Sequence, residues 1–491
     1  MRGHLAAYFE SHHKLVETSA LQLILTSPQP LALSRELIES IAGDSAFVTV
    51  EMVEGLLGRV PGPPGARLEA PPAPRAPVPY ALLVEGYDAP PAGREPLGAY
   101  GDLFASRFRS LARILRTRPE LAGARPVADV RRAEGRMSVI GMVRDVRTIS
   151  EKHHLKLTLE DDSGAIELFV PHGSEAARST FLVDEVIGVV LLVPKDRDRS
   201  PRLLAVLRPE VPVTGAGHRA EGPGRALFLS DLHIGSKSFL ADEWAALVAF
   251  LHEREGPADV AREIRQVVVA GDLVDGIGIY PNQERDLAIG DIFEQYAELG
   301  RRLAELPSRL EIVVVPGNHD AVCPAEPQPA LPAEVRSTFP ANVHALANPS
   351  TFALDGVVVE AYHGRSFDDL IPALPGASYA RPTDVMKRML GMRHLAPMYG
   401  GRTPLAPLAR DGLVIDPAPD ILVTGHVHTY GVDRYRGTLL LNVSTWQAET
   451  EYQKMRNISA VPAHGAIVRL RDLSVTTIDC TGGAVALTAA A

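Results

Sequence analysis

The sequence contains very few cysteines and no long apolar run. Cys323 and Cys480 are the only cysteines among 491 residues, too few and too far apart for a disulfide framework or a cysteine-based zinc site. No stretch approaches the about 18 apolar residues of a membrane span, and residues 1–17 lack the uninterrupted apolar core of a signal peptide. We therefore expect a cytoplasmic protein of a reducing compartment, without a membrane partner.

Positive charge is also scarce. The chain carries 50 Lys and Arg residues against 60 Asp and Glu residues, which gives a formal net charge of -10. This balance excludes a protein that coats DNA by bulk electrostatic attraction, because contacts with phosphate require clustered Lys and Arg side chains. Any binding of nucleic acid must therefore depend on a local cluster of residues, on metal ions or on a partner protein.

The chain is too long for one ordinary hydrophobic core, so several domains are expected. Apolar residues recur at helical spacing near the amino terminus, which predicts a small helical module over residues 1–58. Residues 59–79 are dominated by Pro, Gly and Ala, a composition typical of an extended linker. Residues 80–125 are expected to form a helical connector, with its clearest helix over residues 103–115.

Residues 126–214 have the pattern of a small barrel. Short segments with alternating apolar residues and many β-branched side chains are joined by a hairpin turn at 162–164. Five or so such strands predict an OB-fold. The barrel serves either as an interaction module or as a platform for single-stranded nucleic acid. The segment has few of the aromatic side chains that stack on bases, which favours the interaction module.

Residues 222–491 alternate short, fully apolar strands with helices, the latter expected near residues 243–253 and 293–306. Apolar runs without alternation indicate strands that are buried on both faces, as in α/β folds. The whole chain is therefore predicted to be a multidomain α/β protein.

Polar residues follow nearly every one of these apolar strands. In α/β sheets, ligands bind beyond the carboxyl ends of the strands, so these separate clusters are expected to meet in one site. Carboxylate, amide and imidazole groups together suit borderline divalent metals such as manganese, zinc or iron. The residues in these clusters are Asp231, His233, Asp272, Asn318, His319, Asp320, His363, His426 and His428.

The ordered clusters DLH, GD, GNHD, HG and GHVH resemble the five motifs of the calcineurin-like metallophosphoesterases, over about residues 225–480. The resemblance implies a calcineurin-like α/β sandwich that holds two divalent ions. Mn2+ is the expected ion, with Mg2+, Zn2+ and Fe2+ as alternatives. The implied ligands are Asp231, His233 and His428 for one ion and Asn318, His363 and His426 for the other, with Asp272 as the bridge.

The resemblance makes His319 the catalytic histidine, beside the ions but not bound to them. Two ions roughly 3.5 to 4 Å apart can activate a bridging water and neutralise a phosphate under attack. His319 can stabilise charge on the phosphate or protonate the leaving oxygen. Two interpretations of Asp320 stay open: it orients the imidazole of His319, or it only caps a turn.

The order of helical module, Pro-rich linker, barrel and phosphoesterase resembles the small subunit of archaeal family D DNA polymerases. It also resembles the accessory B subunits of eukaryotic replicative polymerases, in which the metal ligands have decayed. Three stretches resemble the archaeal family most specifically. They are LFLSDLHIGSKSF, YHGRSFDDLI and NVSTWQAETEYQKMRNISAVPA.

This resemblance implies a 3′–5′ exonuclease that proofreads as part of a two-subunit polymerase. The expected partners are the large catalytic subunit and DNA with single-stranded or mismatched 3′ ends, and a sliding clamp is a further candidate. Two alternatives remain. One is a mainly structural accessory subunit, and the other is a stand-alone phosphodiesterase or phosphatase. The complete ligand set favours the exonuclease.

Overall fold

The structure is a computed structural model of the whole chain. It describes residues 5, 8–9, 14–25, 27, 30–40, 47–57, 80–87, 96–149, 153–196, 198–213, 217–449 and 459–490. The predicted Pro-rich linker, residues 59–79, lies outside the described residues, as does part of the predicted helical module.

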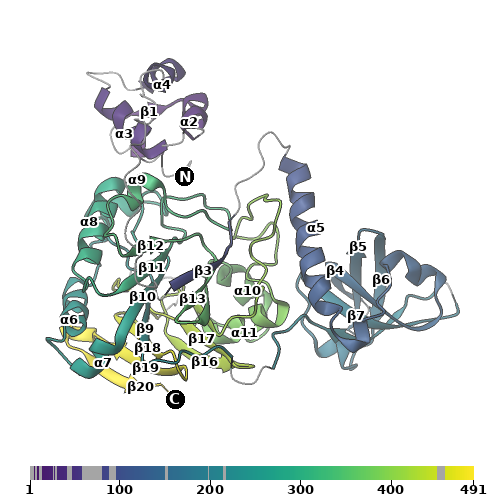
Figure 1. Cartoon of the computed structure of the whole chain (residues 1–491). Coiled ribbons are helices and arrows are strands. Elements are labelled where there is room, and N and C mark those ends of the chain that lie inside the picture. The colour runs from purple at the N-terminus through teal and green to yellow at the C-terminus, as the bar shows by residue number, and fades with distance from the viewer. Residues whose placement is uncertain are drawn as a thin grey trace, which may run out of the picture.

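Two β-sheets form the larger body of the molecule (Figure 1). In the first sheet the strands β9 to β12 run parallel, and β18 continues the sheet antiparallel to β9. The first sheet has the order β12 (Val343–Ala345), β11 (Glu311–Val315), β10 (Ile264–Ala270), β9 (Arg225–Leu229), β18 (His464–Arg469), β19 (Ser474–Asp479), β20 (Ala486–Ala489).

The second sheet has six strands, and in it β14, β15 and β17 run parallel. Its order is β16 (Gly431–Tyr435), β17 (Thr438–Asn442), β15 (Ile421–Thr424), β14 (Val357–Ala361), β13 (Ser350–Leu354), β3 (Tyr80–Glu85).

The two sheets pack face to face. Phe228 and Val268 of the first sheet share one buried cluster with Phe352 and Val359 of the second. The opposite face of each sheet is covered by helices, so the central strands are buried on both sides, as their uninterrupted apolar sequences predict. The helices on the first sheet are α6 (Ala241–Leu251), α7 (Ala258–Glu263), α8 (Ile292–Ala304) and α9 (Ala333–Arg336), and those on the second are α10 (Phe367–Ala373) and α11 (Pro382–Met392). The mixed α/β architecture agrees with the prediction.

A closed five-stranded barrel forms a separate lobe (Figure 1). Val139, Leu157, Leu168 and Val189 fill its interior. The strand order is β4 (Gly135–Ile149), β5 (His154–Asp161), β6 (Gly164–Val170), β8 (Arg202–Leu207) and β7 (Val186–Val193). Its assignment as an OB-fold stays a prediction.

Residues 80–125 are helical only in part, which corrects the predicted helical connector. Helix α5 (Pro96–Leu115) packs on the outside of the barrel, with Leu111 and Leu115 buried against it. Residues 80–85, however, form strand β3, which pairs antiparallel with β13 at the edge of the second sheet. The segment YALLVE is short and apolar, and its partner strand lies far away in the sequence, so local spacing did not reveal the pairing.

Near the amino terminus, the described residues include the helices α2 (Thr18–Leu25), α3 (Pro30–Ser40) and α4 (Val50–Leu57). A short parallel pair, β1 (Leu15–Val16) and β2 (Phe47–Val48), joins them. Tyr8 packs edge-on against Phe293 of α8, with ring centroids 5.0 Å apart. This contact places the segment before α2 against the helical layer that covers the first sheet. Among the described residues, no helix is both long and apolar enough to cross a membrane.

Candidate metal centre

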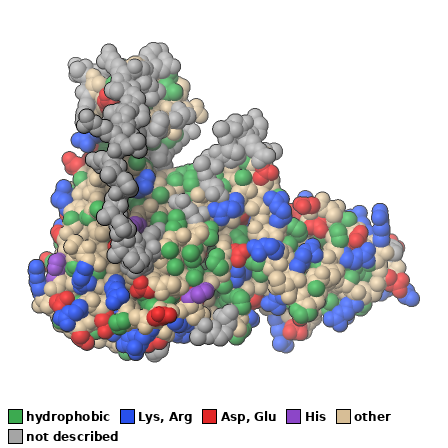
Figure 2. Space-filling model, in the orientation of Figure 1, with side chains coloured by type: hydrophobic (Ala, Val, Ile, Leu, Met, Phe, Trp, Pro, Cys, Tyr) green, Lys and Arg blue, Asp and Glu red, His purple; other side chains and the backbone are tan. Residues whose placement is uncertain are grey.

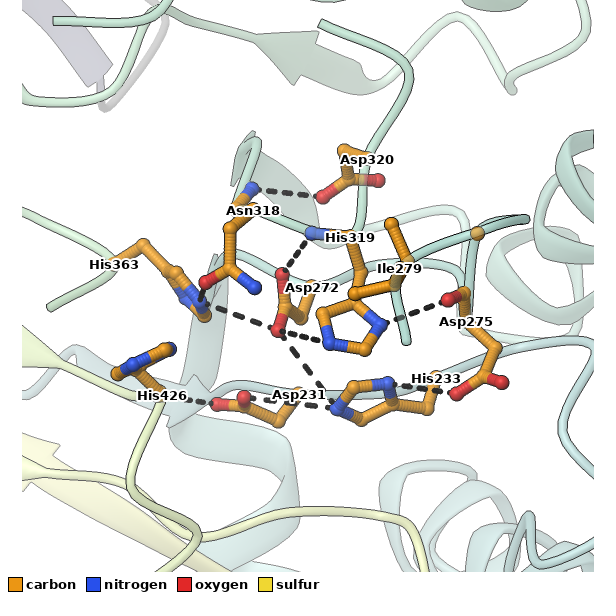
Figure 3. A network of polar contacts seen from close by, with 12 residues as sticks. Asp231, His233, Asp272, Asp275, Ile279, Asn318, His319, Asp320, His363 and His426 are labelled. Atoms are coloured by element: carbon orange, nitrogen blue, oxygen red, sulfur yellow. Dashed lines mark hydrogen bonds and ion pairs between the residues drawn. The ribbon is translucent and has the colours of Figure 1, made fainter. Parts of the chain in front are cut away.

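All the polar clusters singled out in the sequence meet at the carboxyl ends of five strands. Strands β9, β10 and β11 of the first sheet supply Asp231, His233, Asp272, Asn318 and His319, and β14 and β15 of the second supply His363, His426 and His428. The site thus lies where the same edge of both sheets comes together. Figure 3 shows the labelled side chains of this set, all except His428, pointing toward one another.

The loops that carry the site are bent in an uncommon way. Asp231, His233, Asp272, His426 and His428 all have φ between 48° and 70°, in the left-handed region. Such a conformation costs of order 1–3 kcal/mol for a residue with a side chain and persists only where the surroundings hold it. Here backbone hydrogen bonds link the loops: the N–H of Asp231 donates to the carbonyl of Gly271, and that of His233 to the carbonyl of Asp272.

One group of candidate ligands consists of Asp231, His233 and His428, all buried. Their potential ligand atoms lie within 4.8 Å of one another. The Nε2 atoms of His233 and His428 are 3.1 Å apart, and Asp231 Oδ1 lies 3.2 Å from His428 Nε2. This Oδ1 is buried and accepts no hydrogen bond from the described residues. An orphaned carboxylate oxygen between two imidazole nitrogens fits a cation site.

A second group consists of Asp272, His363 and His426. His363 Nε2 lies 3.3 Å from Asp272 Oδ2 and 3.2 Å from Asn318 Oδ1. Asp272 lies between the two groups, because its Oδ2 is also 3.9 Å from His233 Nε2. The four predicted residues of this group are therefore brought together, and Asp272 occupies the position expected of a bridge.

Hydrogen bonding to the ring of His363 sets its tautomer. Its Nδ1 lies 2.9 Å from the carbonyl oxygen of Ala270, which can only accept, so Nδ1 carries the proton. In the neutral ring Nε2 is then an acceptor, and it faces the oxygens of Asp272 and Asn318, which also accept. Three acceptors converging on one point fit a metal ion, and the carbonyl is the usual partner that orients a ligating imidazole.

The charges of the site are strongly coupled. Burial lowers the pKa of His363, but the carboxylate of Asp272 outweighs burial and raises this pKa to about 9. In the same way Asp231 and Asp275 overcome burial and raise the pKa of His233 to about 10. Burial raises the pKa of Asp272, but His363 and His319 hold it well below its usual range. The carboxylates thus attract positive charge, which protons or metal ions can supply.

His319 lies at the open side of the site. Its side chain is 16% exposed, and its Nε2 is 3.9 Å from Asp272 Oδ2. Its Nδ1 lies 2.8 Å from the carbonyl oxygen of Asp275 and donates to it, which leaves Nε2 free to exchange a proton. Burial lowers the pKa of His319. His319 also forms a third possible ligand group with His233 and Asp272. Its contacts suit an acid or base as well as a ligand.

Asp320 does not orient the imidazole of His319, which corrects one of the two expectations for this residue. Its carboxylate accepts from the backbone N–H groups of Gly317 and Leu273, at 2.8 and 3.1 Å, and from the hydroxyl of Tyr296, at 2.9 Å. Burial and the neighbouring Asp272 raise its pKa to about 7. Asp320 therefore holds the loops after β10 and β11 together.

Three residues outside the predicted set of site residues support the site. Asp275 lies 3.1 Å from His233 Nδ1, and Gln447 donates to the same carboxylate oxygen of Asp275 at 3.0 Å. Asp368 lies 3.4 Å from His426 Nε2. Asp368 and Gln447 fall within stretches that resemble the archaeal family, so that resemblance was the signal that could have found them.

Two glycines allow the loops to approach closely. A Cβ atom on Gly317 would lie 2.2 Å from Asp272 Oδ1, and one on Gly425 would lie 2.3 Å from Asp231 Oδ2. Any larger residue at either position would displace a candidate ligand.

Solved structures with some likeness include the vacuolar protein sorting 29 protein of Cryptosporidium parvum and a predicted phosphoesterase of Streptococcus pneumoniae. The first has a TM-score of 0.28 and 17% identity, and the alignment covers 54% of this chain and 96% of that one. The second has a TM-score of 0.25 and 13% identity, and covers 56% and 100%. No conclusion follows from likeness at these TM-scores.

Sequence comparison is more specific. The family model that describes the B subunit of DNA polymerases alpha and epsilon matches residues 226–432, which contain all the predicted site residues. The DNA polymerase II small subunit of Archaeoglobus fulgidus is 44% identical over 369 residues, 74% of each chain. That of Methanothermobacter thermautotrophicus is 42% identical over 381 residues, 75% of this chain and 77% of its own. These matches confirm the predicted resemblance, and the chain belongs to the family of archaeal DNA polymerase II small subunits.

Proposed function

We propose that this chain is the 3′–5′ exonuclease subunit of a two-subunit DNA polymerase and hydrolyses DNA phosphodiesters with two divalent ions. The proposal includes a calcineurin-like phosphoesterase over residues 222–491, preceded by an OB-fold over residues 126–214. One observation carries it: the carboxylate of Asp272 lies between two groups of candidate ligands, with its Oδ2 3.9 Å from His233 Nε2 and 3.3 Å from His363 Nε2.

The chain's own residues suggest a division of labour. Asp231, His233 and His428 would hold one ion, and Asn318, His363 and His426 the other, with Asp272 between them. When bound, the ions would activate a water and neutralise charge on the phosphate. His319 Nε2 would give a proton to the leaving oxygen, because its Nδ1 is already committed to the carbonyl of Asp275.

The buried carboxylates also keep the histidines in place. Asp275 fixes the ring of His233, and the carbonyl of Ala270 fixes that of His363. Ligands that are held before an ion binds lose little freedom on binding, which favours a functional site. A purely structural subunit makes no use of this arrangement.

The direct test is incubation of the purified chain, with and without Mn2+, with a 5′-labelled single-stranded oligonucleotide. A metal-dependent ladder of shortened products is expected. The same ladder from a 3′-labelled substrate would indicate the opposite polarity. No cleavage of any DNA, with intact metal uptake, would overturn the exonuclease. Cleavage of small phosphodiesters alone would then favour the stand-alone phosphodiesterase.

We further propose that a large catalytic subunit is the partner, as the name of the related small subunits implies. The chain has a formal net charge of -10, so the complex rather than the isolated chain is expected to supply most of the attraction to DNA. DNA affinity and exonuclease rate should be compared at the same salt for the isolated chain and for the chain co-expressed with the large subunit. Equal DNA affinity and equal exonuclease rate in both preparations would contradict the proposal that the chain depends on this partner.

A further inference from the structure

An exposed aromatic side chain, Tyr399, lies on the loop after α11 that is hydrogen-bonded to the start of α10. Tyr399 is 51% exposed, and among the described residues it is the one aromatic side chain in the set of exposed large apolar side chains. Its ring rests edge-on against Tyr100 and Phe104 of α5, with centroids 5.0 and 5.6 Å away. Its backbone N–H donates to Asp184 of the barrel at 2.9 Å. The ring therefore packs on α5, its backbone is hydrogen-bonded to the barrel lobe, and the side chain still faces solvent.

The loop that carries Tyr399 leads directly to the site. The backbone N–H groups of Arg402 and Thr403 donate to the carboxylate of Asp369, at 2.6 and 2.9 Å. The preceding residue, Asp368, contacts His426 of the second ligand group at 3.4 Å. The amino-terminal end of α10 thus contacts both the loop that carries Tyr399 and the candidate ligand His426.

Two arginines lie along the same path. Arg365 follows His363 by two residues, and its side chain donates to the carbonyl of Pro324 at 2.7 Å. Arg402 is exposed, and within the described part of the chain its guanidinium makes neither a hydrogen bond nor an ion pair. Figure 2 shows Lys and Arg side chains gathered where α5 meets the body with the two sheets.

The acidic groups on this path are already engaged. Asp368 is paired with His426, Asp369 accepts from the backbone of its loop, and Asp184 lies near Arg107 and accepts from Tyr399. These contacts offset part of their negative charge. Arg402 also lies near Asp368, and Arg365 lies near the buried Glu326, so each guanidinium is partly compensated and its remaining positive charge is available to an anion. In a chain of net negative charge, these two arginines are the positive charges that this route offers to a phosphate.

We infer that Tyr399, Arg402 and Arg365 form a path for single-stranded nucleic acid leading to the metal centre. A base stacks on the ring of Tyr399, and the guanidinium groups of Arg402 and Arg365 bind the phosphates between that base and the reacting end. Stacking on an aromatic ring combined with arginine contacts to the backbone is how proteins bind single strands without sequence preference. This inference rests on the proposed exonuclease and names the residues that would guide its substrate.

The test compares steady-state kinetics of the full chain, alone and with the large subunit, on a 5′-labelled single-stranded oligonucleotide and on bis(p-nitrophenyl) phosphate. Tyr399→Ala should raise KM for the oligonucleotide roughly 5- to 100-fold more than KM for the small diester, which has no base at that distance. Tyr399→Phe should restore the oligonucleotide KM, because it keeps the ring. Val213→Ala, at a side chain 76% exposed, is the matched control.

Arg402→Ala and Arg365→Ala should weaken oligonucleotide binding and flatten its dependence on salt, since each removes a phosphate contact. Arg471→Ala, on the turn between β18 and β19, is the control. Unchanged KM in both Tyr399→Ala and Arg402→Ala would overturn the inference while leaving the exonuclease intact. Loss of affinity for the large subunit, without a change in oligonucleotide KM, would overturn it too and would make the surface a protein contact. A wild-type chain that cleaves only the small diester would instead contradict the proposed function.

Discussion

At the scale of single residues, the site depends on a few ligand atoms that face one another. Within the part of the chain that the structure describes, Asp231 Oδ1 is buried and accepts no hydrogen bond, and His363 Nε2 faces the oxygens of Asp272 and Asn318. Asp272 touches both ligand groups, whereas His319 contributes its ring from one side. Replacing Asp272 and replacing His319 should therefore affect metal binding and hydrolysis differently.

Asp272→Ala should abolish hydrolysis and reduce metal uptake, because it removes the carboxylate that both groups share. His319→Ala should leave metal uptake intact and slow hydrolysis by roughly 10²- to 10⁴-fold, as expected for a lost proton donor. Metal content and oligonucleotide cleavage, measured on the same preparations, separate the two roles. Equal loss of metal in both variants would show that His319 is itself a ligand.

A buried carboxyl outside the site offers a test of pH dependence. Glu360 of β14 is buried and hydrogen-bonded to Thr351 of the neighbouring strand, and burial raises its pKa to about 7. A carboxyl whose pKa is raised by folding stabilises the fold at a pH below its unfolded pKa, near 4.5, and loses that contribution as pH rises through 7. Relative to Glu360→Gln, the wild type should lose about 3 kcal/mol of unfolding free energy between pH 4.5 and pH 8.

Chemical denaturation of both proteins across this range gives the comparison. The variant keeps a hydrogen-bonding side chain but has no titrating carboxyl, so other ionisable groups cancel in the difference. A stability difference that does not change with pH would mean that the Glu360 carboxyl titrates alike in the folded and unfolded chains.

At the scale of elements, a buried ion pair fixes α5 to both lobes. The Nε of Arg107 donates to Asp411 of the larger body at 2.7 Å, and the same guanidinium donates to the carbonyl of Pro397. It also reaches the carbonyl of Asp184 in the barrel, at 3.4 Å. Burial opposes the charge of Asp411, but Arg107 and His394 outweigh it and hold the pKa of Asp411 below its usual range.

Arg107→Leu should lower the unfolding free energy by about 3–5 kcal/mol, because it leaves the carboxylate of Asp411 buried without its main counter-charge. Adding Asp411→Asn to that variant should recover about half of the loss, since the buried charge is removed as well. The unfolding free energies of the wild type, the two single variants and the double variant, measured with denaturant, form a double-mutant cycle. If Asp411→Asn destabilises the Arg107→Leu variant further, the two side chains contribute independently to stability.

At the scale of the whole molecule, strand β3 ties the region before the barrel to the larger body. It pairs with β13, and the N–H of Gly86 donates to the carbonyl of Pro349 at 3.0 Å. The predicted linker ends just before this strand. A truncation that keeps β3 should therefore differ sharply from one that removes it.

A chain lacking residues 1–79 should fold and take up metal, losing only the amino-terminal helices and contacts such as Tyr8 on Phe293. A chain lacking residues 1–95 also loses β3 and should be less stable by roughly 2–5 kcal/mol, because the edge of β13 loses its hydrogen bonds. Thermal unfolding and metal uptake of the two truncated chains give the comparison. Equal stability would show that β3 contributes nothing to the second sheet.

The sequence by itself determined the chemistry of the site and the order of its parts. The ligand types occur in short clusters directly after apolar strands, so both the strands and the side chains at their ends can be read locally. The same locality explains why the family resemblance, the apolar layers and the helices near residues 243–253 and 293–306 were predicted. Helices α6 and α8 lie within two residues of those ranges.

The tertiary structure alone decided which of these residues touch. Arg107 and Asp411 are 304 positions apart, Gln447 and Asp275 are 172 apart, and β3 pairs with a strand more than 250 residues later. Asp320 adjoins His319 in the chain, yet it turns away from the imidazole because three donors from other loops satisfy its carboxylate. The spacing of apolar residues reports only the period of the helix or strand that contains them. It does not say which distant residues will pair, because those contacts form only when the two sheets, the barrel and helix α5 pack together.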